Sequence, residues 1–148
     1  MPTWLKGILI TLGVIIVLVS AVGTGIYVWW QRNREAMIAS GRAAMDEGSR
    51  FGTGKDSWAC ADEAARRIKG AGFNEAVNAG LFLGRCLPVA KLAPGFCDGV
   101  PGPMDILANV SWGAQLNQKY GLSPPFETAA LPQVIQKFCE TQAKGSQR

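Results

Sequence analysis

The hydrophobic positions fall into one long uninterrupted run at the N-terminus and several shorter, periodic groups after it. Between Gly7 and Trp30 the sequence contains no Asp, Glu, Lys or Arg. A helix rises about 1.5 Å per residue, so this run reaches roughly 36 Å and exceeds the hydrocarbon core of a bilayer, about 30 Å thick. The pattern predicts a single transmembrane helix, with residues 7–30 embedded in lipid.

Aromatic and basic residues flank the apolar run at both ends, as they do at membrane–water interfaces. The predicted interface residues are Trp4, Lys6, Tyr27, Trp29, Trp30 and Arg32. A cleaved signal peptide is the main alternative, with Ala21 and Gly23 as the small residues of the cleavage site. Because the apolar run continues past them to Trp30, we favour a retained signal anchor.

The segment after the apolar run is rich in Ala and Met and then in Gly. Residues 32–47 are predicted to form a stalk helix. Gly48, Gly52 and Gly54 follow at short intervals, and because Gly weakens helices we expect a loop there. The chain is thus expected to divide into an anchor at 1–31, a stalk helix and Gly-rich linker at 32–56, a helical domain at 57–143 and a polar tail at 144–148.

Two helices with contrasting faces are predicted next. Ser57 is a favourable N-cap for the first of them. The apolar residues that recur at helical spacing after it are Trp58, Ala61, Ala65 and Ile68. A second helix is predicted from Asn74, as its N-cap, to about Leu87. That helix is apolar on most sides, which indicates a central helix with neighbours on most sides.

Two further helices follow a loop rich in Pro and Gly at residues 88–103. Pro103 suits the first turn of the next helix, and Gly121 suits its C-terminal stop. The inward face predicted for this helix comprises Ile106, Leu107, Val110, Ala114 and Tyr120. The last helix is predicted from about Ala130 to Ala143, with Pro132 in its first turn. Its predicted inward residues are Leu131, Ile135 and Phe138.

No stretch alternates with the period of two that indicates a strand. The predicted fold class is therefore all-α: one N-terminal transmembrane helix plus a small disulfide-stapled bundle of about four helices. The length that remains after the anchor fits one domain, and a domain of this size can bury its own core.

Four cysteines, all in the helical domain, are the most informative side chains. They are Cys60, Cys86, Cys97 and Cys139, and they allow three pairings. An even number of cysteines in a small domain indicates two disulfides. The sequence lacks a C-x-x-C motif, which argues against a redox-exchange site or a zinc ribbon. The pairing we favour joins Cys60 on one helix to Cys86 at the end of the central helix, which leaves Cys97 for Cys139.

Two signals disagree about the side of the membrane on which the domain lies. Basic residues after the apolar run outnumber Lys6 before it, and the positive-inside rule would then place the domain in the cytoplasm. The paired cysteines indicate an oxidising compartment instead. Because long domains translocate largely regardless of flanking charge, we expect an inner-membrane protein with a periplasmic domain.

The composition argues against most catalytic and nucleic-acid-binding functions. The sequence has no His, which is the commonest general base and metal ligand. Asp62 and Glu63 are adjacent, and adjacent helical residues do not face each other. The net charge of +4 is mild and forms no basic stripe. We expect no catalytic residue, metal, cofactor or nucleic-acid partner.

Three side chains are candidate contacts for a protein partner. Trp is enriched at interface hot spots, which makes Trp112 one candidate, with a place in the core as the alternative. Arg66 and Arg67 form a small basic spot on a polar helix face, where solvation of the helix is the alternative.

Residues 77–139 also carry a pattern similar to a known family. The segment Ala79–Gly84, the loop Phe96-Cys97-Asp98-Gly99-Val100-Pro101 and a terminal Phe138-Cys139 resemble the periplasmic amidase-immunity proteins of type VI secretion. The resemblance implies a small disulfide-bonded helical domain that blocks a cell-wall-cutting toxin. The chain departs from that family in the loop order around its Pro and in its membrane anchor, and no inhibitory residue carries over.

These patterns favour a non-enzymatic, membrane-anchored envelope protein that binds a protein partner, as an accessory or assembly subunit of a membrane complex. An immunity protein against a cell-wall amidase is the second hypothesis. An enzyme that works through carboxylates, Tyr or Lys alone is the third.

Overall fold

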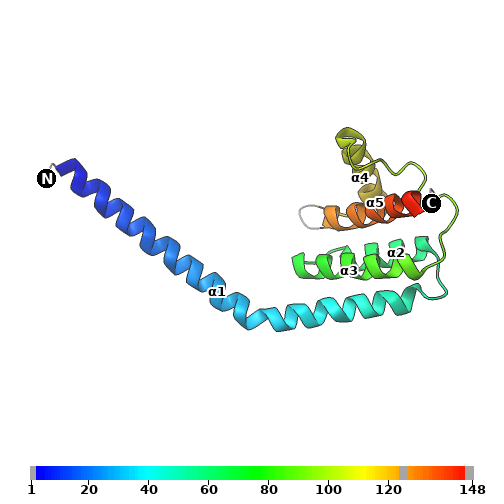
Figure 1. The fold of residues 1–148 in the computed structure, drawn as a ribbon, viewed down its shortest axis with the longest axis horizontal. Coiled ribbons are helices and arrows are strands. Elements are labelled where there is room, and N and C mark those ends of the chain that lie inside the picture. The colour runs from blue at the N-terminus through cyan, green and yellow to red at the C-terminus, as the bar shows by residue number, and fades with distance from the viewer. Residues whose placement is uncertain (1–2, 124–126, 146–148) are drawn as a thin grey trace. The chain divides into compact units, whose positions relative to one another are not determined.

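The computed structural model describes residues 3–123 and 127–145, apart from the side chains of Thr3, Leu5, Lys6 and Leu9. Those residues form five helices and no strand, which confirms the all-α fold class (Figure 1). The helices are α1 (Thr3–Gly52), α2 (Ser57–Ile68), α3 (Phe73–Val89), α4 (Ile106–Tyr120) and α5 (Glu127–Gly145).

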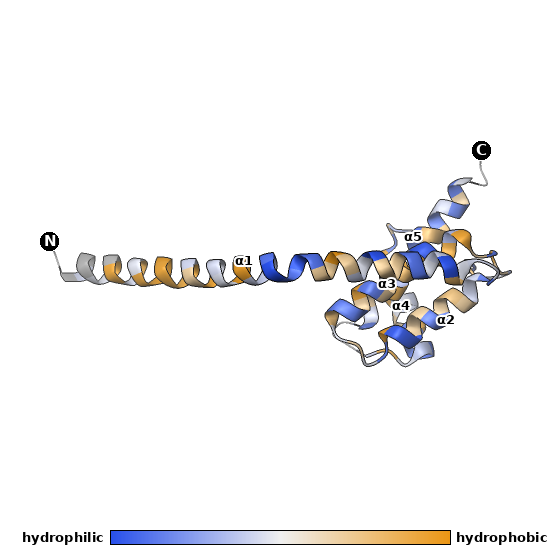
Figure 2. Ribbon diagram, turned by 90° about the horizontal axis from the view of Figure 1, so that it is seen from below, coloured by the Kyte–Doolittle hydropathy of each residue, from blue (hydrophilic) through white to orange (hydrophobic). Residues whose placement is uncertain are grey.

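The chain divides into two compact units, Met1–Ile38 and Ala39–Arg148, and α1 is continuous from the first into the second. In the first unit the hydrophobic positions gather along the N-terminal part of α1 (Figure 2). This helix contains a window with a mean hydropathy of 2.2, none of which is buried within the protein. Its length and composition make it a candidate membrane anchor or signal sequence.

The second half of α1 packs closely against α3 through a stripe of small residues. A Cβ atom placed on Gly48 would lie 2.2 Å from the carbonyl oxygen of Phe82, and one on Gly52 would lie 2.5 Å from that of Cys86. The loop predicted at Gly48 and Gly52 is therefore wrong, because the helix continues through both. Here the glycines serve close backbone approach, and only Gly54, with a φ of 81°, lies in the turn that follows.

The residues predicted as a stalk thus contribute to the helical unit itself. The Phe51 ring lies 5.5 Å from the Phe82 ring, and Glu47 forms an ion pair with Arg67 at 2.6 Å. Ala44 belongs to the buried core. The compact unit begins at Ala39, upstream of the boundary expected at residue 57, because α3 needs this third neighbour to cover its outer face.

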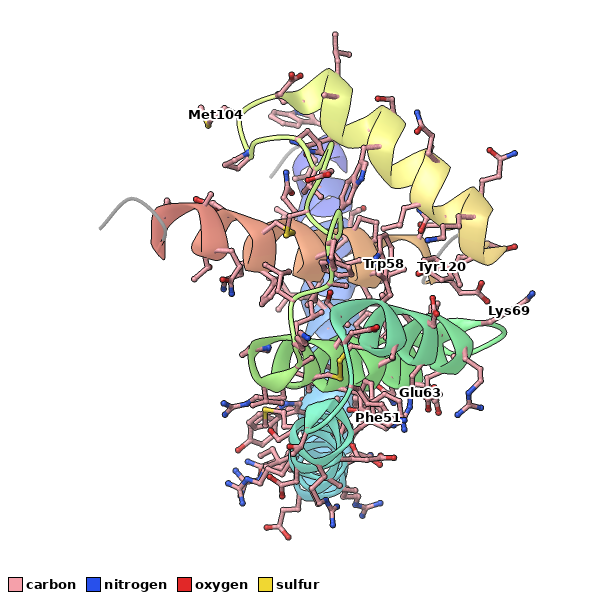
Figure 3. All side chains as sticks on the ribbon, turned by 90° about the vertical axis from the view of Figure 1, so that its right-hand side faces the viewer. Phe51, Trp58, Glu63, Lys69, Met104 and Tyr120 are labelled. Carbon is pink, nitrogen blue, oxygen red and sulfur yellow. A yellow bond between two sulfur atoms is a disulfide. The ribbon has the colours of Figure 1, made fainter. Side chains whose placement is uncertain are left out.

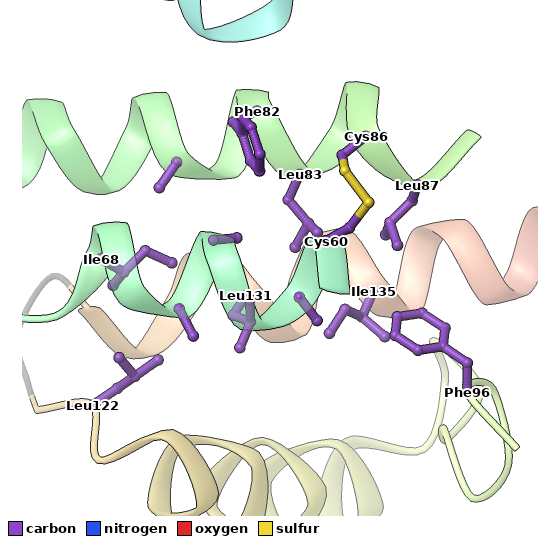
Figure 4. Close-up of a cluster of buried hydrophobic side chains, with 14 of the residues drawn as sticks. Cys60, Ile68, Phe82, Leu83, Cys86, Leu87, Phe96, Leu122, Leu131 and Ile135 are labelled. Atoms are coloured by element: carbon purple, nitrogen blue, oxygen red, sulfur yellow. A yellow bond between two sulfur atoms is a disulfide. The ribbon is translucent and has the colours of Figure 1, made fainter. Parts of the chain in front are cut away.

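The core lies where α2, α3 and α5 meet (Figure 4). Its largest fully buried apolar side chains are Ile68, Phe82, Leu83, Leu87 and Leu131. The face predicted for α2 is confirmed, since Ala61, Ala65 and Ile68 are buried. Burial of such side chains supplies about 1.5–3 kcal/mol each relative to exposure, and this supports the short helices that alone would be marginal.

Both predicted disulfides are confirmed. Cys60 is joined to Cys86, with Cα atoms 5.8 Å apart, and Cys97 is joined to Cys139, with Cα atoms 5.5 Å apart. The first bond lies inside the core between α2 and α3, where both cysteines are fully buried. The second ties the loop between α3 and α4 to α5.

The predicted N-caps of α2 and α3 are each displaced by a residue or two. Asp56 caps α2 by accepting a hydrogen bond from the Ala59 amide at 2.8 Å. Ser57 is instead buried, and its hydroxyl oxygen accepts from the Ala93 amide at 3.0 Å. Gly72, without a side-chain cap, precedes α3, so Asn74 lies inside that helix. Ser57 thus holds the segment that follows α3, and this tertiary hydrogen bond takes the place of the N-capping hydrogen bond that was predicted for Ser57.

The starts of the last two helices also differ from the prediction. Pro103 precedes α4, which begins after the N-cap Asp105, and the predicted stop at Gly121 is confirmed by its left-handed φ of 64°. Because α5 begins at Glu127, Pro132 lies inside the helix and leaves the Thr128 carbonyl without its helical amide donor. The Asn117 side chain of α4 donates to that carbonyl at 3.0 Å and compensates the loss.

Candidate functional site

Four large apolar side chains at the start of α4 face solvent. We call them the apolar ledge: Met104, Ile106, Leu107 and Val110, whose exposed fractions are 91%, 73%, 84% and 68%. Met104 stands at the outer edge of the molecule in Figure 3. Exposed apolar side chains scattered singly are ordinary, whereas a contiguous group indicates an interaction site.

The face of α4 that was predicted to point inward is mostly wrong. Ile106, Leu107, Val110 and Ala114 face outward, and only Tyr120 of the predicted set packs against the core. The inward residues are Trp112, Leu116 and Tyr120, spaced four apart. Since α4 is apolar on two sides, periodicity alone could not decide which side meets the core. Trp112, Leu116 and Tyr120 also recur at helical spacing, which is the signal that could have marked their face as one of two candidates.

Polar contacts hold the ledge in a defined position. Asn109, which lies between the ledge residues, donates to the Gly102 carbonyl at 3.0 Å. Gln136 of α5 donates to the Pro101 carbonyl at 2.9 Å and also contacts the Asn109 side chain. Together with the Cys97–Cys139 bond, these contacts fix the loop before α4 to α5. The ledge is therefore preorganised, which lowers the entropy cost of binding.

The tryptophan proposed as a partner contact, Trp112, lies half-buried against the core. About two turns further along α4, the Tyr120 hydroxyl donates to Asp62 at 2.9 Å and links α4 to α2. Burial raises the pKa of Tyr120 well above its usual value, and the Asp62 carboxylate adds to the shift. Tyr120 thus stays protonated and serves as a structural donor.

The two arginines proposed as partner contacts have different surroundings. Arg67 pairs with both Glu47 and Glu63, and its guanidinium lies 4.0 Å from the centroid of the Phe82 ring. These contacts occupy Arg67 inside the helical unit, between α1 and α2. Arg66 pairs with Glu63 at 2.7 Å, while 71% of its side chain remains exposed. Arg66 is the more accessible of the two, because only 25% of the Arg67 side chain is exposed.

This arginine cluster predicts a dependence of stability on pH. Hydrogen bonds from Arg66, then Arg67, lower the pKa of Glu63 from 4.5 to about 2. A carboxyl whose pKa is lower in the folded state stabilises the fold above pH 4.5, and this contribution is lost as the pH falls from 4.5 towards 2. Because solvent reaches the cluster, we expect Glu63→Gln to lower the free energy of unfolding by about 1 kcal/mol at neutral pH.

Urea denaturation of the full chain in detergent, followed across that pH range, would measure this effect. The difference between wild type and Glu63→Gln should shrink to nothing near pH 2. Glu75→Gln serves as the matched control, because Glu75 forms no ion pair within the described residues. A difference that stayed constant with pH would assign the effect to packing rather than charge.

The residues predicted at the membrane interface lie on α1 in the first unit, except that the side chain of Lys6 lies outside the described residues. Trp4, Tyr27, Trp29 and Trp30 are exposed, with between 48% and 65% of each residue accessible. Gln31 donates to the Tyr27 hydroxyl at 2.8 Å, and the Arg34 guanidinium lies 5.7 Å from the Trp30 ring centroid. Arg32 is likewise exposed.

Among residues 3–123 and 127–145, no three His, Cys, Asp or Glu side chains converge to hold a metal ion. All four cysteines are oxidised in disulfides. The strongest pKa shifts are those of Glu63, Arg67 and Tyr120. Arg67 and Tyr120 form contacts that join helices, and Glu63 forms ion pairs within α2. These groups therefore explain the stability of the unit, and the apolar ledge remains as the candidate site.

Comparison with protein-family models, with curated proteins and with solved structures finds no match for this chain. Its most distinctive surface is the preorganised apolar ledge at the start of α4.

Proposed function

We propose that this chain is a single-pass membrane-anchored envelope protein whose helical domain binds a protein partner without catalysis, as an accessory or assembly subunit of a membrane complex. The observation that carries the proposal is the apolar ledge, in which Leu107 is 84% and Val110 68% exposed. An apolar helix face that is held rigidly and left uncovered suits insertion into a hydrophobic groove of another protein.

The proposal places the anchor in the inner membrane and the helical domain in the periplasm. Its support is the exposed apolar part of α1 together with two disulfides, since such bonds persist in oxidising compartments. In cells with a permeabilised outer membrane, a membrane-impermeant maleimide should label the chain only after reduction. Labelling that required rupture of the inner membrane would place the domain in the cytoplasm, and a mature mass that began near Gly23 would show a cleaved signal.

Loss of apolar character on the ledge should abolish partner binding without unfolding the domain. We expect Leu107→Asp combined with Val110→Asp to remove a copurifying partner, with at least a tenfold loss of recovery, because hot-spot truncations cost about 2 kcal/mol or more. The thermal midpoint should change little, since both side chains are largely exposed. Affinity purification from mild detergent followed by quantitative mass spectrometry would measure the recovery.

A matched control comes from the same helix. Gln118→Asp adds a carboxylate to an exposed position of α4 about three turns beyond Leu107. It should leave the recovered partner unchanged. If the ledge variant and the Gln118 variant recover the same proteins in the same amounts as the wild type, the ledge is not the binding surface.

An immunity protein against a periplasmic cell-wall amidase is the second candidate function. The observation that favours it is that the two Phe-Cys pairs behind the resemblance meet in space. Cys97 is joined to Cys139, and the Phe96 and Phe138 rings lie 6.1 Å apart in an edge-to-face arrangement. This candidate expects the chain to protect cells from an amidase toxin encoded beside it. Equal killing with and without the chain would remove this candidate and leave the binding proposal intact.

A further inference from the structure

A second surface of the helical unit, away from the ledge, is a groove of about 620 Å³ along α3. Its floor is the face of α3 that carries Val77 and Leu81, one wall is α5, and Met45 of α1 contributes to the lining. The apolar lining residues are Met45, Val77, Leu81, Leu87, Pro88, Val134 and Phe138. Val77 and Leu81, which the sequence placed in a helix packed on most sides, are 44% and 37% exposed here.

The helices beside the groove run in the same direction, as Figure 1 shows for α3 and α5. A Cβ atom on Gly80 would lie 3.6 Å from the Ala130 Cβ, and one on Gly84 would lie 3.9 Å from a Val134 methyl. The two helices therefore keep the same register along the groove: each residue of α3 lies level with the residue of α5 that is 50 positions later. Arg85 is then level with residue 135, and Lys137 lies two residues, or about 3 Å, further along the helix axis. The two cations thus lie at one level of the groove.

The charge of the groove is uncompensated. Its lining contains Arg85 and Lys137 and no Asp or Glu. Neither cation forms an ion pair within the described residues, in contrast to Arg66, Arg67 and Lys144. Two positive charges beside an apolar floor match a ligand that is apolar along most of its length and anionic at one point.

We propose that this groove binds an anionic amphiphile with a single acyl chain. The carboxylate or phosphate head lies between Arg85 and Lys137, and the acyl chain lies along α3 over Leu81 and Val77. The floor from Val77 to Pro88 is roughly 16 Å long at the helical rise. The site is distinct from the apolar ledge, so it adds a ligand to the proposed partner-binding function.

The volume is that of a small-molecule site. Small-molecule sites enclose about 300–1,000 Å³, and the groove lies within that range. The two glycines in the groove agree with a ligand site. Packing of α3 against α5 does not require glycine at Gly80 or Gly84, because a Cβ at either position would make only ordinary van der Waals contacts.

Photolabelling of the full chain in nanodiscs of phosphatidylcholine would test the site. The probe is a fatty acid with a diazirine on its acyl chain, and label is mapped by mass spectrometry. We expect label on α3 and α5 residues of the groove, reduced about tenfold in the Arg85→Glu, Lys137→Glu variant, because charge-assisted contacts are lost. A diazirine lysophosphatidylglycerol, which also has one acyl chain, forms a second arm and distinguishes the phosphate head of a lysophospholipid from the carboxylate of a free fatty acid.

Two controls make the result decisive. The Lys55→Glu, Lys91→Glu variant carries the same change of charge on exposed residues outside the groove, and its label should match the wild type. An alkylammonium probe with the same chain and diazirine should label the groove weakly. Equal labelling by the cationic probe, or label that does not respond to Arg85→Glu, Lys137→Glu, would overturn the proposal. A failure to recover a partner through the apolar ledge would count against the proposed function but not against this lipid site.

Discussion

Replacing Cys97 and Cys139 together by Ala should lower the free energy of unfolding by about 4 kcal/mol. The bond spans 42 residues, and closing a loop of that length restricts the unfolded chain by about this amount in the chain-entropy model. Cys139 is also nearly buried, so its replacement removes some packing. Urea denaturation of the full chain in detergent, followed by the fluorescence of Trp58 and Trp112, would measure the loss.

The same substitution should also abolish the function that we propose for the ledge. Without the bond, the loop before α4 is held to α5 by the Gln136 contacts and the Phe96–Phe138 ring contact, none of which is covalent, and the ledge loses its fixed position. Replacing Cys60 and Cys86 by Ala is the matched control, since it costs about 3.5 kcal/mol for a separation of 26 residues and leaves that loop tied. If both double variants bound the partner equally well, preorganisation of the ledge would not matter.

A methyl group at Gly48 should be the most disruptive addition to the surface between α1 and α3. Gly48→Ala is expected to lower the free energy of unfolding by about 3 kcal/mol, at the upper end for overpacked sites. The new Cβ would lie 2.2 Å from the Phe82 carbonyl oxygen, so backbone rather than a flexible side chain must move. The gain in helix propensity from Gly to Ala, about 1 kcal/mol, is too small to offset this.

Two neighbouring glycines provide a graded comparison. At Gly41 the nearest atom to an added Cβ is the end of the Leu81 side chain at 3.2 Å, which can rotate away. Gly41→Ala should therefore be neutral or slightly stabilising, while Gly52→Ala, at 2.5 Å from a carbonyl oxygen, should resemble Gly48→Ala. Chemical denaturation of the three variants would establish the order. A stable Gly48→Ala protein would show that α1 does not need to approach α3 so closely.

The α1–α3 contact also bears on how the helical unit is held together. The helix that carries the apolar N-terminal run enters this unit directly, and Glu47 and Phe51 attach it to α2 and α3. The boundary between the two units falls inside a helix, since α1 is continuous through Ile38 and Ala39. The same residues that were expected to act as a spacer therefore support the core.

Much of the architecture could be predicted because it depends on local physics. The uncharged apolar run, the polar and apolar faces of α2 and the left-handed stop at Gly121 each follow from a residue and its neighbours in sequence. The disulfide pairing that we favoured among the three possible ones is also the one observed.

The candidate sites could not be predicted in the same way, because they depend on which surfaces other elements cover. Periodicity predicted the ledge residues of α4 as part of its inward face, and only the packing of Trp112, Leu116 and Tyr120 decided that the ledge faces outward. Arg85 and Lys137 are far apart in sequence and meet only through the parallel register of α3 and α5.

Sequence by itself determined that this chain has an apolar N-terminal helix, a helical unit and two disulfides, since hydrophobicity, periodicity and cysteine number are properties of the chain alone. Tertiary structure decided that Gly48 and Gly52 continue a helix instead of ending it, because the approach of the α3 backbone outweighs the local cost of Gly. It decided likewise that Pro132 is tolerated within α5, where Asn117 satisfies the carbonyl left free. Local preference is worth about 1 kcal/mol per residue, and packing across helices exceeds it.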